Sequence, residues 1–293
     1  MNLGLTVLEI VAPVFLLAAF GFLWVKLGFE YRVQFVTQMA MTLSVPCLIF
    51  VSLMQTQIAP AALTALSAAA VAAYGVLTVA MWLVTRAARL ETRTYTAPLI
   101  FGNTGNLGLP LALFAFGEIG VDYAVVVFAV MAIWSFTYGI WLVSGGGSML
   151  KVLKEPLVGA TVLGGLFLWQ GWQTPTFLTN TLTLCGQMAI PLMLITLGVA
   201  VARLTPGRLG QAAILSLVKV CICAGVGWAV GTWFQLDKTA FAVLVLQLAT
   251  PVAVTSYLLA EKYGADSDAV AGLVVASTVM SVVALPLLLA VLL

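Results

Sequence analysis

The chain is divided into apolar stretches that reach or approach the length needed to cross a lipid bilayer. A membrane-spanning helix takes about 20 predominantly apolar residues, and 63% of the 293 residues are hydrophobic whereas only 8% are charged. Because a backbone in hydrocarbon must pair its own N–H and C=O groups, such stretches form helices. The sequence therefore predicts an all-α membrane protein with ten transmembrane helices. The expected spans are residues 5–25, 34–54, 61–84, 95–117, 122–144, 156–171, 177–201, 209–234, 239–260 and 268–292.

The basic residues lie almost entirely in every second connection. Ten of the twelve follow an odd-numbered span, whereas Lys238 lies in an even-numbered connection and Lys219 lies within a span. By the positive-inside rule the odd-numbered connections face the cytoplasm. We therefore expect a multi-pass protein of the cytoplasmic (inner) membrane with both termini outside. The ten residues are Lys26, Arg32, Arg86, Arg89, Arg93, Lys151, Lys154, Arg203, Arg208 and Lys262.

Similar features recur at a nearly constant distance along the chain. The prolines Pro46 and Pro191 are 145 positions apart, Pro110 and Pro251 are 141 apart, and the acids Asp122 and Asp266 are 144 apart. Each repeat holds five spans, and an odd number turns the second copy upside down in the membrane. We expect residues 1–148 and 149–293 to form two inverted five-helix repeats, a plan that recurs in secondary transporters.

The fourth span contains a segment that opposes a continuous helix. Residues 101–110 read Phe-Gly-Asn-Thr-Gly-Asn-Leu-Gly-Leu-Pro. Pro110 has no N–H, and its ring clashes with the carbonyl group four residues earlier. The amides of Asn103 and Asn106 are costly in hydrocarbon unless they face a partner or a cavity. Two half-helices around an unwound segment are expected, the place where a transporter holds its substrate; the alternative is a plain proline kink.

The ninth span contains a second such segment. Thr250 followed by Pro251 has the form of an N-cap residue and a first-turn proline, so we expect a half-helix to begin there and another at Pro110. Two helix N-termini would then meet at the membrane centre, where their partial positive charges attract a carboxylate. The expected binding residues of the two segments are Asn103, Thr104, Asn106, Gly108, Pro110, Gln247, Thr250 and Pro251.

Lys219 is the ninth expected site residue. It stands near the middle of the eighth span, where a charged side chain is costly and marks a pathway or a paired group. The alternatives are that it snorkels to the membrane surface or pairs with the carbonyl groups at a helix C-terminus. Glu9 and Glu118 lie near helix ends and are expected to be ordinary interfacial residues.

Composition excludes several classes of protein. The chain contains no histidine, which removes His-dependent metalloproteases, Ser-His-Asp hydrolases and most zinc sites. The four cysteines lie in apolar stretches and are expected to be small core residues. The net charge of +2 does not indicate nucleic-acid binding. No catalytic residue, metal or cofactor is expected.

Several motifs resemble those of the auxin efflux carrier family. The order Asn103-Thr104-x-x-x-Gly108-x-Pro110 resembles its fourth-helix motif, and the segment from Thr250-Pro251 to Asp266 resembles its ninth-helix motif. Pro13 with Gly21, and Ser44-Val45-Pro46, are similar to the opening of that family. The resemblance runs over essentially the whole chain.

The resemblance implies two crossing broken helices, 4 and 9, within ten spans of inverted five-plus-five topology. It also implies an elevator carrier, in which a transport domain of spans 3–5 and 8–10 moves against a scaffold of spans 1, 2, 6 and 7, commonly as a homodimer through the scaffold. Asn103 and Pro110, with Pro251 opposite, would line the anion site. Short bacterial members are described as carriers of small organic acids such as malate or malonate.

The chain departs from the plant members of that family in two ways. The connection after the fifth span is only Ser144 to Glu155, and the third span has no ionisable side chain except Tyr74. Indole acetate is therefore not the expected substrate.

We predict a secondary carrier for a small organic anion, with the anion, the bilayer and a second copy of the chain as partners. A sodium-coupled symporter of similar architecture is the near alternative, weakened by the shortage of carboxylates inside the spans. The absence of histidine and of paired midspan carboxylates opposes an intramembrane enzyme. A non-transporting receptor built on a carrier fold stays open.

The distribution of basic residues predicts the topology. A single cysteine introduced at position 89 should react with an impermeant thiol reagent only after the membrane is opened, because that connection is expected to be cytoplasmic. Labelling of this cysteine on intact cells would overturn the assignment.

Overall fold

The structure is a computed structural model that describes residues 3–56, 58–145, 156–204 and 208–293. In these ranges every regular element is a helix, and an isolated antiparallel bridge joins two extended residues. The predicted repeat boundary at 148/149, and the basic residues Lys151 and Lys154, lie outside them. The α-helices are α1 (Leu3–Lys26), α2 (Val33–Met39), α3 (Val45–Gln55), α4 (Pro60–Ala87), α5 (Thr92–Ile100), α6 (Leu109–Trp134), α7 (Ile140–Ser144), α8 (Pro156–Gln170), α9 (Thr176–Gln187), α10 (Ala189–Arg203), α11 (Leu209–Trp233), α12 (Lys238–Leu248), α13 (Val254–Tyr263) and α14 (Ser267–Leu292). The π-helical segments are η1 (Ala40–Ser44), η2 (Thr104–Gly108) and η3 (Ser135–Gly139).

Seven helical runs in the described residues are long and apolar enough to cross a membrane. They are Val7–Lys26, Val33–Gln55, Pro60–Ala87, Thr104–Ser144, Thr176–Arg203, Leu209–Trp233 and Ser267–Leu292. Two shorter apolar helices, Val158–Gln170 and Lys238–Leu248, accompany them. The prediction of an all-α, multi-pass membrane protein is confirmed.

The longest of these runs, with 41 residues, turns back on itself at Gly117. This residue has φ 66° and ψ −156°, a backbone conformation open to glycine because it has no Cβ. Gly105 and Phe128, on opposite sides of the turn, lie against each other: a Cβ on Gly105 would stand 3.1 Å from Cε2 of Phe128. The run is therefore a pair of antiparallel helices, and the turn falls where the fourth predicted span ends.

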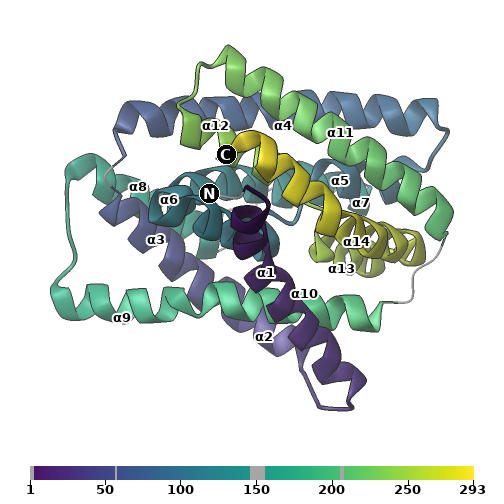
Figure 1. The fold of residues 1–293 in the computed structure, drawn as a ribbon, viewed down its shortest axis with the longest axis horizontal. Coiled ribbons are helices and arrows are strands. Elements are labelled where there is room, and N and C mark those ends of the chain that lie inside the picture. Colours follow the sequence, from purple (N-terminus) through teal and green to yellow (C-terminus); the bar gives the residue numbers. More distant parts are fainter. Residues whose placement is uncertain (1–2, 57, 146–155, 205–207) are drawn as a thin grey trace.

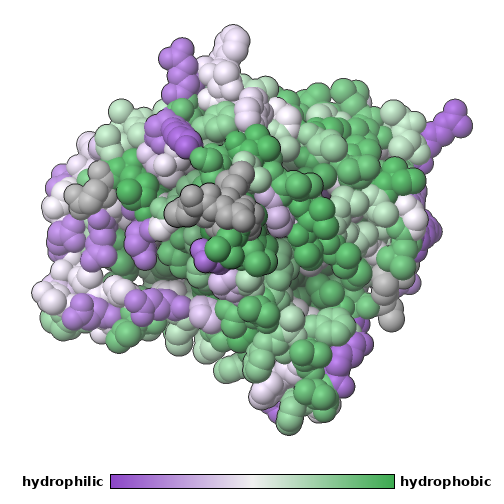
Figure 2. All heavy atoms as spheres, in the orientation of Figure 1, coloured by the Kyte–Doolittle hydropathy of each residue, from purple (hydrophilic) through white to green (hydrophobic). Residues whose placement is uncertain are grey.

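The outer surface is apolar in the way a bilayer requires. Large hydrophobic side chains project outward from several helices, and Leu16, Val162 and Val291 are 67%, 68% and 66% exposed. Figure 2 shows hydrophobic residues over most of one face, with hydrophilic residues gathered toward its ends. Soluble proteins do not expose apolar patches of this extent, so the surface fits contact with lipid.

The helices pack in two groups. In one group α1 lies on α10, and α3 lies on α8 and α9; in the other, α11 lies on α12 and α14, and α6 lies on α4 and α12. Figure 1 shows α9 and α10 running end to end along one edge of the molecule, with α4 and α11 along the opposite edge. The segments that carry the predicted site, η2 and α12, touch each other.

Small residues bring α1 and α10 into close contact. A Cβ on Gly198 would overlap the backbone oxygen of Ala18, and one on Gly21 would overlap that of Ile195. Close approach through small residues is the usual way for helices to associate in lipid, where apolar burial gives no extra driving force.

This contact predicts the effect of a methyl group. Gly198→Ala should lower the thermal stability of the purified protein, because the overlap with backbone costs roughly 1–3 kcal/mol. Gly225→Ala in α11 is the matched control, since nothing lies within 4 Å of its added Cβ. That change should leave stability equal or raise it by up to about 1 kcal/mol through helix propensity. Equal melting temperatures for the two variants would contradict the tight α1–α10 contact.

Candidate functional site

The two predicted helix interruptions are present, and they meet. The helix α5 ends at Ile100 and helical structure resumes at Thr104, while α12 ends at Leu248 and α13 begins at Val254. Between these ends, Gly102 forms an antiparallel bridge with Val252. The backbone bonds are Asn103 N–H to Pro251 C=O at 2.7 Å and Ala253 N–H to Phe101 C=O at 3.4 Å. Each interruption leaves backbone N–H and C=O groups without a partner in its own helix, and the other segment supplies partners for them. Backbone groups buried in a membrane need such partners.

The first half-helix begins earlier than predicted. Pro110 was expected to start it, but the chain re-enters a helix at Thr104 through the π-helical η2. Here the Gly108 N–H donates to the Asn103 carbonyl, five residues back, at 3.1 Å. The wider turn ends two residues before Pro110. This proline has no N–H group and so cannot donate the backbone hydrogen bond of a regular α-helix. The segment η1 likewise ends at Ser44, two residues before Pro46.

The predicted roles of Thr250 and Pro251 as N-cap and first-turn residues are wrong. The residue that precedes α13 is Ala253, and Pro251 lies in the extended segment. The Thr250 hydroxyl instead donates to the carbonyl oxygen of Gln247 at 2.7 Å, closing the end of the preceding helix α12. The half-helix does not begin at Pro251 because the residues after Thr250 pair with residues 101–103, and this pairing keeps their backbone extended.

Two glycines allow the segments to approach each other. A Cβ on Gly102 would overlap the side chain of Thr250, and one on Gly108 would overlap the amide of Gln247. The predicted residues Gly108, Gln247 and Thr250 are therefore brought together across the crossing. Gly102 was missed, although a glycine inside an apolar helix pattern is itself a signal of close backbone approach.

Several side chains at the crossing have polar atoms without a partner. Among the described residues, Nδ2 of Asn103, Oγ1 of Thr104 and both amide atoms of Gln247 are buried and make no hydrogen bond. An unpaired buried polar group costs roughly 1–3 kcal/mol. These atoms can donate to and accept from a bound molecule or water.

Asn106 faces a cavity beside the crossing. This small cavity, the crossing cavity, lies between the first turns of η2 and α13 on one side and α2, η1 and α10 on the other. Thr37, Thr196 and Thr255 add hydroxyl groups to its wall. Sequence reasoning missed these threonines, because they come from three separated elements and follow no local motif.

A second, larger cavity adjoins the first. It shares Val33, Val254 and Leu258 with the crossing cavity. Its outer wall includes Arg203, whose Nη2 donates to the backbone oxygen of Tyr31 at 2.6 Å. This second cavity, the Arg203 passage, therefore adjoins the crossing cavity and is lined by two arginines, Arg203 and Arg32, and one glutamate, Glu30.

Lys219 also reaches the crossing, from a different direction. It is 1% exposed and lines a separate small cavity together with Ala249, Thr250 and Pro251. Its Nζ donates to Sγ of Cys223 at 3.7 Å. The lysine is therefore close to the residues that follow α12, but it does not line the crossing cavity.

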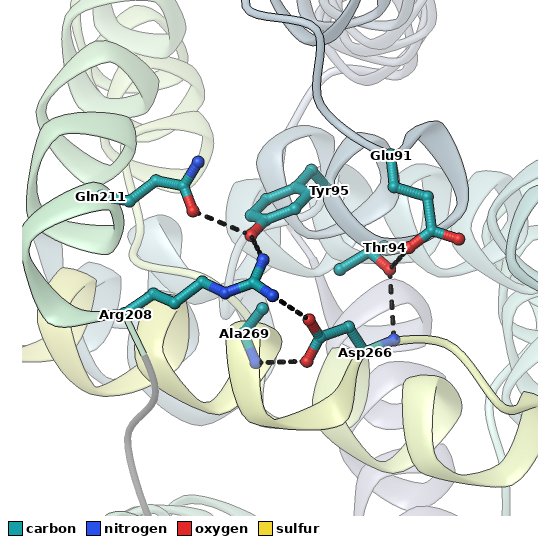
Figure 3. Close-up of polar contacts among 7 residues, drawn as sticks. All are labelled: Glu91, Thr94, Tyr95, Arg208, Gln211, Asp266 and Ala269. Atoms are coloured by element: carbon teal, nitrogen blue, oxygen red, sulfur yellow. Dashed lines mark hydrogen bonds and ion pairs between the residues drawn. The ribbon is translucent and has the colours of Figure 1, made fainter.

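Polar side chains tie the outer ends of the crossing helices to their neighbours. Figure 3 shows Arg208, which precedes α11, pointing at Tyr95 of α5 and at Asp266 before α14. The distances are 3.2 Å from Nη1 to the Tyr95 hydroxyl and 3.2 Å from Nη2 to Oδ2 of Asp266. Tyr95 in turn donates to Gln211 at 3.0 Å, and Asp266 accepts from the Ala269 N–H at 3.0 Å. The network joins the starts of α5, α11 and α14.

A similar arrangement holds the start of α12. The Tyr123 hydroxyl, from the antiparallel partner of the first half-helix, donates to Oδ2 of Asp237 at 2.7 Å. Oδ1 of the same carboxylate accepts from the backbone N–H of Thr239 and Ala240 and so caps α12. Both interrupted helices are thus fixed at their outer ends by contacts from the other half of the chain.

Comparison with known proteins places the chain among transporters. The family model described as membrane transport protein matches residues 6–148 and 140–289, nearly the whole chain. A protein from Methanothermobacter thermautotrophicus described as an uncharacterized transporter is 29% identical over 192 residues. That match covers 63% of this chain and 63% of the relative, so the chain spans less than two thirds of the relative's length in the alignment.

The unpaired amide of Gln247 predicts that the ligand-free protein becomes more stable when this amide is replaced by an apolar group. Gln247→Leu keeps the size of the side chain and removes two unpaired polar atoms, so it should raise the stability of the ligand-free protein by roughly 1–3 kcal/mol. Thermal unfolding of the purified protein measures this effect. Gln173→Leu is the control, because Nε2 of Gln173 donates to the Met54 carbonyl at 3.1 Å and this change should not stabilise. A large loss of stability in the Gln247 variant would show that its amide is paired.

Proposed function

The chain belongs to the auxin efflux carrier family of membrane transport proteins, and from this premise we propose that it is a secondary carrier for a small organic anion. One observation carries the proposal. Two interrupted helices cross at Asn103 and Pro251, buried polar atoms without partners lie at the crossing, and Asn106 of the same segment lines a cavity. Secondary transporters use interrupted helices at the membrane midplane to hold their substrates.

The charge of the substrate follows from the surroundings of the crossing cavity. The first turns of η2 and α13 border it through Asn106, Val254 and Thr255, and helix N-termini carry partial positive charge. No aspartate or glutamate is among the described residues that line it. Its polar side chains are the amide of Asn106 and three threonine hydroxyls, which can bond to a carboxylate, and the adjoining Arg203 passage carries two arginines and one glutamate. These features favour a small mono- or dicarboxylate such as malate or malonate.

We further propose ten spans in two inverted repeats. The hairpin at Gly117 supplies two antiparallel helices, and α12 with α13 supplies another interrupted span. The second and seventh proposed spans are interrupted at matching places: η1 ends at Ser44, two residues before Pro46, and α9 gives way to α10 at Met188, three residues before Pro191. The repeats would be residues 1–148 and 149–293.

The packing supports a division into two moving parts. The scaffold would contain α1–α3 and α8–α10, and the transport domain α4–α7 and α11–α14. Thr37 and Thr196 of the scaffold and Asn106 and Thr255 of the transport domain line the same cavity, so sliding of one part on the other would open and close it. This is an elevator mechanism. We propose a homodimer through the scaffold, in the cytoplasmic membrane, with both termini outside and the Arg203 passage facing the cytoplasm.

Counterflow in proteoliposomes tests the proposal. Purified protein is reconstituted into vesicles loaded with unlabelled malonate or malate, and labelled compound is added outside. Saturable accumulation above protein-free vesicles is expected. Absence of counterflow for every small mono- and dicarboxylate tried, with protein that remains folded, would favour the non-transporting receptor.

The crossing predicts two different mutant phenotypes. Asn103→Ala should weaken substrate binding about ten- to a hundredfold, the value of a lost hydrogen bond to a charged group of roughly 1.5–3 kcal/mol. Pro110→Ala should favour a regular helix across η2, and so impair transport more than binding. Affinity and uptake are both measured in the reconstituted protein.

Asn180→Ala is the control for these variants, because Asn180 is exposed on α9 away from the crossing. It should leave both properties unchanged. If Asn103→Ala and Pro110→Ala also leave them unchanged, the crossing does not hold the substrate.

A further inference from the structure

Lys219 is a charged side chain in full burial without a charged partner. It projects from the middle of α11, ten residues after the start at Leu209 and fourteen before the end at Trp233. At 1.5 Å per residue either end is at least about 15 Å away, farther than a lysine side chain reaches. Its 1% exposure agrees, so the lysine does not snorkel. In the described residues no carboxylate forms an ion pair with it, and its bond to Cys223 at 3.7 Å is to a weak acceptor.

The lysine instead faces the C-terminal end of α12. The cavity that it lines is also lined by Ala249, Thr250 and Pro251, the three residues that follow this helix. The C-terminus of a helix carries partial negative charge on its last carbonyl groups. An ammonium group there is stabilised by the helix dipole without a formal counter-charge.

The rest of this cavity is lined by the hydroxyl groups of Ser216, Ser277 and Ser281 and by the apolar side chains of Val220, Met280 and Ala284. Ser277 accepts from the Val252 N–H at 3.0 Å, and Ser281 donates to the Thr278 carbonyl at 2.6 Å. Oγ of Ser216 has no partner in the described part of the chain. Hydroxyl oxygens, loop carbonyls and a helix C-terminus are also the groups with which interrupted helices of secondary transporters hold sodium. Lys219 places its ammonium where such an ion would bind.

The other half of the chain has a neutral group at the matching place. Tyr74 lies on α4, 145 positions before Lys219, the same distance that separates Pro46 from Pro191. It is 1% exposed, its hydroxyl has no partner among the described residues, and its ring stacks on Phe101 with centroids 6.3 Å apart. Phe101 directly follows α5 as Ala249 follows α12. Each crossing helix thus ends against one side chain of a neighbour, but only the end of α12 has a positive charge.

We propose that the Lys219 ammonium is the built-in cation of the crossing and takes the place of a bound sodium ion, so that the carrier works without sodium. The inference rests on the proposed function. A tethered cation offsets the negative end of α12 permanently and leaves the opposite helix ends free for the substrate carboxylate. No ion has to bind or leave in each transport cycle.

Thermal unfolding of the purified protein tests the proposal without any substrate. The wild type should have the same melting temperature in sodium chloride and in choline chloride. Lys219→Met fills the space without the charge and should unfold at lower temperature in both salts. Lys219→Ser leaves room and an added oxygen, so sodium should raise its melting temperature whereas choline should not. Lys262→Met, at an exposed lysine, is the control and should behave as the wild type does.

Counterflow of labelled malonate gives the functional readout. Replacing sodium by choline should leave wild-type uptake unchanged. Lys219→Arg should retain part of the activity, and Lys219→Met should lose uptake about ten- to a hundredfold even where it folds.

Two sets of results would overturn the proposal. Sodium-dependent stability or uptake of the wild type would show a coupled symporter, and a Lys219→Ser variant without a sodium response would show that the vacated place is no cation site. Full stability and uptake of Lys219→Met would show that the lysine is a tolerated core residue. The unfolding experiment keeps these results separate from a failure of the carrier proposal, because it needs no transported compound.

Discussion

The pairing of two extended segments at the crossing is the constraint on which the rest of the structure depends. A helix interrupted inside hydrocarbon frees backbone groups that water cannot reach. Here each interruption supplies partners for the other, through the bonds between Asn103 and Pro251 and between Ala253 and Phe101. Such pairing needs close backbone approach, which Gly102 and Gly108 permit. Neither broken helix could therefore be stable without the other.

The crossing also separates charges of opposite sign. The half-helices that start after the breaks direct their positive ends toward the crossing cavity at Asn106, where the polar side chains are one amide and three hydroxyls. The helices that end before the breaks direct their negative ends toward Tyr74 and Lys219. Unpaired atoms such as those of Gln247 lower stability, and this cost is typical of a site that is completed by a ligand.

The contacts around the crossing hold some helix ends in place, whereas the crossing cavity leaves space between helices. The contacts of Arg208 with Asp266 and of Tyr123 with Asp237 fix the outer ends of the crossing helices, and glycines lock α1 onto α10. An exposed ion pair contributes little stability by itself. Its effect here is to position helix ends. The crossing cavity, in contrast, lies where the two groups of helices face each other.

The sequence by itself determined the helical class, the two interruptions and most of the residues at the crossing. These follow from local properties: apolar length, prolines without an N–H, and amides that are costly in lipid. Only the tertiary structure decided that helical structure resumes at Thr104, that Thr250 closes α12, and that Thr37, Thr196 and Thr255 share a cavity. Those details depend on backbone pairing and packing between residues far apart in the chain, which no local pattern records.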